Sequence, residues 1–428
     1  MKIPLAIHVQ NWRSSALIKR IILFISVFGP ATITAMADND AGGVATYSIA
    51  GAKLGYPILF PLFIITILLG ITQEMGMRLT LITRRGLADI IREKYGVKVS
   101  LIMFISLFIA NMGTITVELS AVKTTSSMLH ISPIPFVILI VLISFFFITF
   151  GNYKLTQSIM LFACLFYLTY VVSAFKAQPD WGLAITNLVY PHGVAWTNSY
   201  LKDYLVIGMG VLGTTITPWG QFFISSFAFD KKIEAGKVSY SQIETYWGAF
   251  LTDFFSFFMI IATAATLFTH QIPLISGEQA ALAIKPFAGE LAGTLFAIGI
   301  LNAGFMGLVV VSLSTAYAFA EFFGLSGSLD TSFKDSKTFY ILFIAQLAVA
   351  AIIMLLPGVN LFQLAIITQV INAMSLPLVF YYLIRLTSDS KIMGKYANNN
   401  FQKYFAIVCT IIICITSVFT LVTVFIKL

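Results

Sequence analysis

Two carboxylates, two positions apart in an otherwise apolar stretch, have the residue type and the spacing to act together as ligands for a cation. Asp38 and Asp40 are followed at once by Gly42-Gly43. A carboxylate at mid-bilayer depth costs several kcal/mol unless it is paired, hydrated or neutralised. Glycine permits an unwound backbone and the close approach of a ligand, so the pattern predicts a broken helix.

Unwinding frees backbone carbonyl groups, such as that of Ala37, which then need partners. Carboxylate and carbonyl oxygens together form a hard ligand set, which suits Mg²⁺, Ca²⁺ or Mn²⁺. We therefore expect Asp38, Asp40 and the Ala37 carbonyl to contribute to a metal site. The competing interpretation is that the aspartates cap a half-helix that starts near Gly43. Capping and ligation can coexist.

A second interruption lies in a later apolar stretch, where Thr214, Thr215 and Thr217 precede Pro218. Proline removes a backbone donor and leaves a carbonyl near Thr214 unpaired. The hydroxyl and carbonyl oxygens of Thr214 and Thr217 could complete an oxygen site. Alternatively, each hydroxyl bonds back to its own helix.

Amide side chains at Gln369 and Asn372 lie in a third apolar stretch, ahead of Pro377. Amides buried in a helical bundle often join neighbouring helices. The sharper hypothesis is that Gln369 is a metal ligand, with Asn372 beside it.

Three further carboxylates, Glu74, Glu118 and Asp253, fall within or near apolar stretches. Carboxylates inside a membrane are by default candidates for an ion pathway or a proton relay. Glu74 precedes Arg78 by four positions, a spacing that favours a structural ion pair on one helix. For Glu118 and Asp253, the structural and functional interpretations both stay open.

The composition requires a bilayer as the solvent. Of the 428 residues, 58% are hydrophobic and only 10% are charged, whereas soluble proteins carry roughly 25% charged residues. The net charge of +8 fits basic loops at a membrane surface better than nucleic-acid binding. The sequence has no GxxxxGK[ST] motif and no nucleophile–base constellation. It therefore predicts no ATP-driven transport, no enzyme activity and no cofactor.

A membrane-spanning helix needs about 20 apolar residues, and the sequence contains eleven such stretches. They are residues 20–53, 56–83, 99–129, 133–151, 155–175, 202–229, 243–269, 287–323, 338–357, 361–386 and 402–426. We expect an all-α polytopic membrane protein with a single transmembrane domain over residues 1–428.

The two interruptions fall in the first and sixth of these stretches. Broken helices at corresponding positions of two halves indicate a transporter site at the membrane midplane. The prediction is a five-plus-five inverted repeat with halves at about 20–175 and 202–386, followed by an additional helix at 402–426.

Most of the 26 Lys and Arg residues fall on the same side of the predicted spans as the N-terminus. Because basic loops stay in the cytoplasm, we expect a cytoplasmic N-terminus and an external C-terminus. The expected location is the plasma membrane of a prokaryote. The sequence leaves the oligomeric state open, and a monomer is compatible with it.

The motifs resemble those of the Nramp family of divalent-metal transporters. Gly29-Pro30, segment 37–48 and Gly55-Tyr56 are similar to the frame of the family's first helix, where Asp-Pro-Gly-Asn occupies the break. On that match, Asp40 takes the place of the metal-binding aspartate and Gly43 that of the metal-binding asparagine. The resemblance covers essentially the whole chain. It implies the fold of the amino acid–polyamine–organocation superfamily.

Several positions depart from the typical Nramp pattern. Thr217 replaces the methionine of the sixth helix, and Trp219 replaces the histidine that follows. Asn111 stands where typical members carry an acidic residue, although Glu118 is kept as an acid. Gln369 matches the glutamine that joins the metal in the tenth helix. These departures look like the Nramp-related branch of magnesium transporters, which implies a harder ligand set and a weaker proton path.

We therefore expect a secondary transporter that moves a divalent cation by alternating access. Mg²⁺ is the leading cargo and Mn²⁺ the second, with weak or no proton coupling. The candidates for the pathway or for coupling are Glu118, Asp253, Glu74, Asn111 and Trp219. Two alternatives stay open, namely a proton-coupled Mn²⁺/Fe²⁺ symporter and a transporter of a small organic solute on the same fold. Two aspartates in the site argue against an anionic solute.

Overall fold

The computed structural model describes residues 16–151, 153–356 and 360–425. Within these ranges the chain forms helices and connecting loops, with no β-strand. Residues 1–15 and 426–428, whose sides of the membrane the sequence predicts, lie outside the described residues.

The α-helices follow one another along the chain with these bounds: α2 Ala16–Val27, α3 Pro30–Ala37, α4 Ala41–Leu54, α5 Leu59–Thr83, α6 Leu87–Met128, α7 Pro133–Phe150, α8 Tyr153–Ala163, α9 Leu168–Lys176, α10 Trp181–Thr186, α11 Asn198–Thr215, α12 Pro218–Asp230, α13 Val238–Thr263, α14 Gly277–Ala281, α15 Lys285–Ala288, α16 Ala292–Phe323, α17 Lys337–Met354, α18 Leu361–Thr387, α19 Ser390–Met393 and α20 Asn400–Phe425. Short 3₁₀ segments join several of them, and a π-helical turn at Ala264–Phe268 extends α13.

Among the described residues, nine helical stretches are long and apolar enough to cross a membrane. They correspond to the predicted spans other than the first and the sixth. The structure divides those two spans, the first into α3 and α4 and the sixth into α11 and α12. The predicted all-α architecture, with eleven spans and breaks in the first and sixth, is confirmed.

The predicted start of the first span is wrong. Residues 20–27 belong to α2, a separate helix that ends at Val27. The chain then turns at Gly29, whose φ of 138° is a conformation that favours glycine, and α3 starts at Pro30. The Glu244 carboxylate accepts a hydrogen bond from the Gly29 N–H at 2.8 Å and so holds this turn. Because α2 is itself apolar, the hydropathy pattern could not reveal the boundary.

The third predicted span, 99–129, is longer in the structure. α6 begins at Leu87 and contains a kink at Gly96, where φ is 81°. The residues before the kink form a first helical segment, and the membrane-spanning segment follows directly after Gly96. Glycine tolerates this backbone conformation, and a Cβ at the position would meet no atom within 4 Å.

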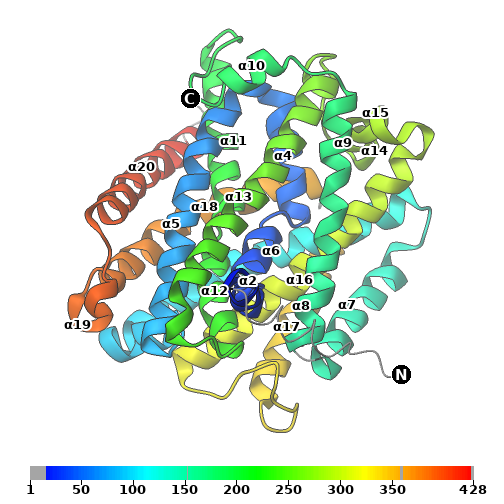
Figure 1. The fold of residues 1–428 in the computed structure, drawn as a ribbon. Helices are drawn as coiled ribbons and strands as arrows, with labels where there is room; N and C mark the ends of the chain where they lie inside the picture. The colour runs from blue at the N-terminus through cyan, green and yellow to red at the C-terminus, as the bar shows by residue number, and fades with distance from the viewer. Residues whose placement is uncertain (1–15, 152, 357–359, 426–428) are drawn as a thin grey trace, which may run out of the picture.

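The broken helices lie at the centre of the bundle. α3 and α4 both pack against α13, while α4 also packs against α11 and α18, and α12 packs against α5 and α16. Figure 1 shows α10 at one end of the bundle and α19 at the other, and we call these the α10 end and the α19 end. α20 packs on α18 at the edge of the bundle. The two breaks are thereby enclosed on all sides by long apolar helices.

Candidate functional site

The first break separates α3 from α4 at Asp38, Asn39 and Asp40. The Asp40 N–H donates to the Ala37 carbonyl at 3.1 Å, so the last turn of α3 tightens before the chain leaves it. Asp40 is the N-cap of α4, and its Oδ1 accepts from the Gly43 N–H at 2.7 Å. The capping role considered from the sequence is therefore present. The second carboxylate oxygen, Oδ2, is buried and has no hydrogen-bond partner.

The second break separates α11 from α12. Thr217 is the N-cap of α12, and its hydroxyl oxygen accepts from the Gly220 N–H at 3.0 Å. The same hydroxyl donates to Asp38 Oδ1 at 3.2 Å. This hydrogen bond joins the two breaks directly. Asp38 Oδ2, like Asp40 Oδ2, is buried without a hydrogen-bond partner.

Thr214, in the last turn of α11, faces Gly43 across the gap between the breaks. A Cβ at Gly43 would lie 3.2 Å from Thr214 Oγ1 and 2.3 Å from the Asp38 carbonyl oxygen. Position 43 therefore has no room for a side chain in this conformation, and Gly43 presents only its backbone. Thr214 Oγ1 is buried and has no hydrogen-bond partner, so this hydroxyl does not bond back to its own helix.

The amide of Gln369 on α18 reaches the same region. Its Nε2 lies 2.7 Å from the point where a Cβ would sit on Gly42 and has no hydrogen-bond partner. Its Oε1 accepts from Asn372 Nδ2 at 2.7 Å, and that nitrogen also approaches Thr114 Oγ1 at 3.2 Å. Both amides are thus brought to the breaks. To bind a cation, Gln369 must turn its amide so that the oxygen faces α4.

Buried oxygens without a hydrogen-bond partner gather at the two breaks. Asp38, Asp40, Thr214, Thr217 and Gln369 are each at most 2% exposed. Buried polar atoms in proteins are nearly always hydrogen-bonded, yet two carboxylate oxygens and one hydroxyl here are not. No Lys, Arg or His of the described residues forms an ion pair with either aspartate. The arrangement has the chemistry of a site for a cation.

The donor set is poor in strong metal ligands. Within the ranges described above, no group of three or more His, Cys, Asp or Glu side chains could hold a metal ion. A cation between the breaks would have two carboxylates, the remaining ligands being hydroxyl, amide and carbonyl oxygens and water. That composition suits a hard ion that keeps part of its hydration shell.

Glu118 on α6 helps to cap the N-terminus of α4. Its carboxylate accepts from the Ala41 N–H at 3.0 Å and from the Gly42 N–H at 3.2 Å. Together with the Asp40 cap, it occupies the first three N–H groups of the half-helix. Negative charge is favourable at this position because of the helix dipole. A Cβ at Gly307 of α16 would lie 2.6 Å from the Glu118 carboxyl group, so close packing holds the carboxylate in place.

Asn39 anchors the first break to α13. Its Nδ2 donates to Thr252 Oγ1 at 2.8 Å, its Oδ1 accepts from Ser256 at 2.9 Å, and its carbonyl accepts from the Tyr167 hydroxyl at 2.6 Å. The sequence alone indicated no role for Asn39, Tyr167, Thr252 or Ser256. A polar side chain between the two aspartates was a signal for Asn39, whereas nothing local to Tyr167 indicates that it reaches the break.

Three further candidates for the pathway, Asp253, Asn111 and Trp219, are buried in the bundle. Asp253 on α13 is buried, neither of its carboxylate oxygens has a hydrogen-bond partner, and it interacts electrostatically with Asp38. Asn111 on α6 donates to Thr315 Oγ1 at 2.8 Å. Trp219 follows the second break, is fully buried, and its indole N–H is unpaired.

Glu74 does not join the site. It forms a buried ion pair with Arg78, with Nε and Oε1 separated by 2.6 Å, and it also accepts from Gln242 and Gln402. Arg78 in turn bonds to Asn398 in the segment between α19 and α20. The structural interpretation of the Glu74–Arg78 spacing therefore holds. The prediction that Glu74 belongs to the ion pathway has no support in this geometry.

Comparison with protein families matches residues 31–423 to the family described as natural resistance-associated macrophage protein-like, or Nramp. Relatives include the divalent metal cation transporter MntH of Verminephrobacter eiseniae, 24% identical over 407 residues that cover 92% of this chain and 88% of the relative. A natural resistance-associated macrophage protein 2 homolog of Dictyostelium discoideum is 24% identical over 390 residues, covering 87% of this chain and 59% of that protein.

Solved structures share the fold. A manganese transporter of Eremococcus coleocola, in complex with an aromatic bis-isothiourea substituted compound, superposes with a TM-score of 0.77 at 19% identity, covering 93% of this chain and 86% of that one. MhsT in complex with L-phenylalanine gives a TM-score of 0.60 at 14% identity, with coverage of 92% and 98%. Both likenesses show the fold of this chain.

Proposed function

Because this chain belongs to the Nramp family, we propose that it is a secondary transporter of a divalent metal cation, with Mg²⁺ as its leading cargo. The observation that carries the proposal is the meeting of two broken helices at Asp38 and Thr217, with Asp38 Oδ2, Asp40 Oδ2 and Thr214 Oγ1 buried and unpaired around them. MntH relatives are named as divalent metal cation transporters, which supports the class of cargo.

The choice of Mg²⁺ rests on ligand hardness. The proposed ligands are the carboxylates of Asp38 and Asp40, the hydroxyls of Thr214 and Thr217, and the amide oxygen of Gln369. The carbonyl of Ala37 and the backbone of Gly43 lie close by. Asn372 orients the Gln369 amide. None is a thioether, thiolate or imidazole, the softer ligands that help to retain transition metals. Mn²⁺ also accepts oxygen ligands, and a solved relative is a manganese transporter, so Mn²⁺ is the second candidate.

Burial of the site favours a carrier over a channel. Asp38 and Asp40 are each 1% exposed, so an ion bound between them has no open path to either end of the bundle. Release requires the half-helices to move, and each break already divides its span into two separate helices. Alternating access by movement of helices around a fixed midplane site fits this construction.

Weak or absent proton coupling is proposed from the surroundings of Glu118 and Trp219. Glu118 accepts from two backbone N–H groups of α4, so its carboxyl group is engaged as a cap of that half-helix. Trp219 places an indole, which does not titrate, next to the second break. Asp253 is the carboxylate left for a coupling role, since it is unpaired and interacts with Asp38.

An anionic organic cargo is disfavoured by the same contacts. Such cargo would bind at the N-terminus of a half-helix. In α4 the first three N–H groups already bond to Glu118 and Asp40, and in α12 the Gly220 N–H bonds to Thr217. These donors are therefore taken by the protein's own side chains.

The orientation is proposed from the loops. α19 carries Lys391 and packs against α5, whose last turn leads into Arg84 and Arg85. Arg84 donates to the Ile233 carbonyl, in the loop that also carries Lys231 and Lys232. Basic loops mark the cytoplasmic side of a membrane. The α10 end then faces outward.

Ion entry into proteoliposomes tests the proposal. Purified protein is reconstituted, and Mg²⁺ and Mn²⁺ entry are followed in parallel with ion-sensitive dyes and a lumen pH dye. We expect Mg²⁺ entry without acidification of the lumen, loss of entry in Asp40→Ala, and normal entry in the control Asp330→Ala, which changes a carboxylate in the exposed loop after α16. Silence for both ions in folded protein would contradict the metal assignment.

A further inference from the structure

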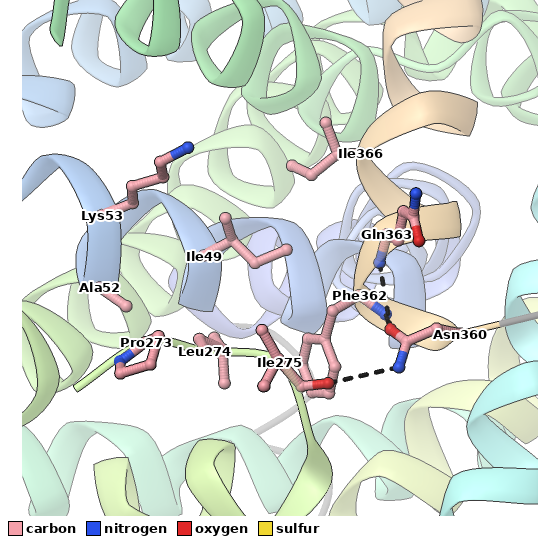
Figure 2. Close-up of a pocket in the computed structure, with 10 residues that line it drawn as sticks. All are labelled: Ile49, Ala52, Lys53, Pro273, Leu274, Ile275, Asn360, Phe362, Gln363 and Ile366. Atoms are coloured by element: carbon pink, nitrogen blue, oxygen red, sulfur yellow. Dashed lines mark hydrogen bonds between the residues drawn. The ribbon is translucent and has the colours of Figure 1, made fainter. Parts of the chain in front are cut away.

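A cavity of about 610 Å³ opens at the α10 end of the bundle, apart from the buried site. Figure 2 shows the outer part of α4 along one side of it and the start of α18 along the other, with the segment Pro273–Ile275 between them. Both of these helices also carry residues of the site. The cavity and the site therefore lie along the same pair of helices.

On α4, the residues that lead from the cavity to the site share one face. Lys53 and Ile49 line the cavity, Thr46 comes one turn further in, and Gly42 lies at the break. The spacings of three or four residues place all four on one side of the helix. The distance from Ile49 to Gly42 along the axis is about 10 Å at 1.5 Å per residue.

On α18, the same order is repeated. Gln363 and Ile366 line the cavity, and Gln369 follows one turn further in. Gln369 lies three positions after Ile366, or about 5 Å along the helix axis. The floor of the cavity is therefore about one turn of helix away from a residue of the proposed site.

The exposed fraction of the side chains falls from the cavity toward the site along both α4 and α18. Lys53 and Gln363 are exposed, Ile49 and Ile366 are half-buried, and Thr46 and Gln369 are fully buried. A Cβ at Gly210 of α11 would lie 3.4 Å from Ile366 Cδ1 and 3.5 Å from Thr46 Cγ2. Ile366 and Thr46 thus pack against the same point of α11. Solvent therefore reaches the two helices only as far as Ile49 and Ile366.

We propose that this cavity is the external vestibule for the cation, that Ile49 and Ile366 form an apolar seal between it and the site, and that Thr46 offers the first oxygen beneath that seal. The inference rests on the proposed function for the identity of the cargo. Hydrocarbon side chains cannot replace the water of a divalent ion, so an apolar constriction blocks its passage until the helices separate. Thr46 Oγ1 is buried without a hydrogen-bond partner, as a transient ligand on this path would be.

Thiol accessibility tests the seal without depending on transport. The background carries Cys164→Ala, Cys409→Ala and Cys414→Ala, which removes the native thiols. Gln363→Cys reports on the vestibule and Thr46→Cys on the space below the seal. A membrane-impermeant thiol reagent is added to intact cells that produce each variant, and the rate of modification is measured.

We expect Gln363→Cys to react at least tenfold faster than Thr46→Cys. Adding Ile366→Ala to Thr46→Cys should raise its rate at least tenfold, because the opening reaches the site from outside. The matched control is Ile367→Ala, which removes the same side chain from the outer surface of the same helix, where it is 51% exposed. Ile49→Ala opens the other half of the seal and serves if the Ile366 variant does not fold.

Equal rates at the two cysteines with both isoleucines intact would overturn the seal, as would equal effects of Ile366→Ala and Ile367→Ala. Absence of reaction at Gln363→Cys from outside would overturn the external assignment. Mg²⁺ and Mn²⁺ should slow modification of Thr46→Cys in the opened variant. If the accessibility pattern holds but neither ion protects, the cargo proposed above fails and the seal stands.

Discussion

Replacement of Glu118 separates a capping role from a proton-carrying role. The carboxylate accepts from the buried N–H groups of Ala41 and Gly42 at 3.0 and 3.2 Å. A buried donor left unpaired costs about 1–3 kcal/mol. Glu118→Ala leaves both groups without this partner, so we expect it to lower the free energy of unfolding by about 2–6 kcal/mol. Glu118→Gln keeps one carbonyl oxygen as an acceptor and should cost about 1–3 kcal/mol.

The assay combines thermal unfolding in detergent with Mg²⁺ entry into proteoliposomes that contain a lumen pH dye. We expect Glu118→Ala to unfold at a lower temperature than Glu118→Gln. The glutamine variant should keep Mg²⁺ entry within about tenfold of the wild type, equivalent to about 1.4 kcal/mol, and lumen pH should not change in either protein. A Glu118→Gln protein that unfolds like the wild type yet no longer takes up Mg²⁺ would contradict a capping role. Loss of a proton flux that the wild type displays would also contradict it.

Three further predictions concern the site and its entrance. Gly307→Ala places a methyl group 2.6 Å from the Glu118 carboxyl group and should reduce Mg²⁺ entry by about tenfold. The control is Gly293→Ala on the same helix, where a methyl group meets no atom within 4 Å and should leave Mg²⁺ entry unchanged. Thr217→Val removes the hydroxyl that caps α12 and contacts Asp38 in the first break. Thermal unfolding should show a decrease of about 1 kcal/mol in the free energy of unfolding, and flux assays should show a higher KM for Mg²⁺. Thr217→Ser keeps the hydroxyl and should keep the stability and the KM of the wild type. Lys53 and Asp203 form an ion pair at the vestibule, with Nζ and Oδ1 2.9 Å apart. A unit charge and a divalent ion about 10 Å apart in water interact by roughly 0.8 kcal/mol, so Lys53→Gln should lower the KM by up to about fourfold at low salt and Asp203→Asn should raise it. Both shifts should vanish at high ionic strength, and shifts that persist there would contradict an electrostatic origin.

The breaks in the first and sixth spans could be predicted because their signals are local. Asp38 and Asp40 precede two glycines, and Thr217 precedes Pro218, all within stretches otherwise long enough to cross a bilayer. Each motif interrupts the helix through its own backbone chemistry, without help from distant residues. The positions of the breaks therefore follow from the sequence alone.

The contacts between helices could not be predicted in the same way. Glu118 bonds to backbone groups of another helix, which identifies a partner only once the packing of α6 on α4 is known. Asn39 turns toward α13 although it lies between the two aspartates. Glu74 had a partner at helical spacing, and that pair forms as the spacing indicated. Local pairing is readable from a sequence, whereas the direction of a side chain near a break depends on tertiary packing.

The vestibule shows the same limit. Ile49 and Ile366 are ordinary apolar residues in apolar helices, and Thr46 is one of many hydroxyls that could bond to its own helix. Their alignment appears only when α4 and α18 lie beside one another and their exposure is compared turn by turn.

Calorimetric titration of Mg²⁺ into the purified protein tests the central claim, that the two breaks form an oxygen site for a divalent cation. We predict saturable binding to the wild type and at least tenfold weaker binding to Asp38→Asn and to Asp40→Asn, because each substitution removes a buried charge next to the ion. Unchanged affinity in both variants, or no binding to folded wild-type protein by Mg²⁺ or Mn²⁺, would contradict the account.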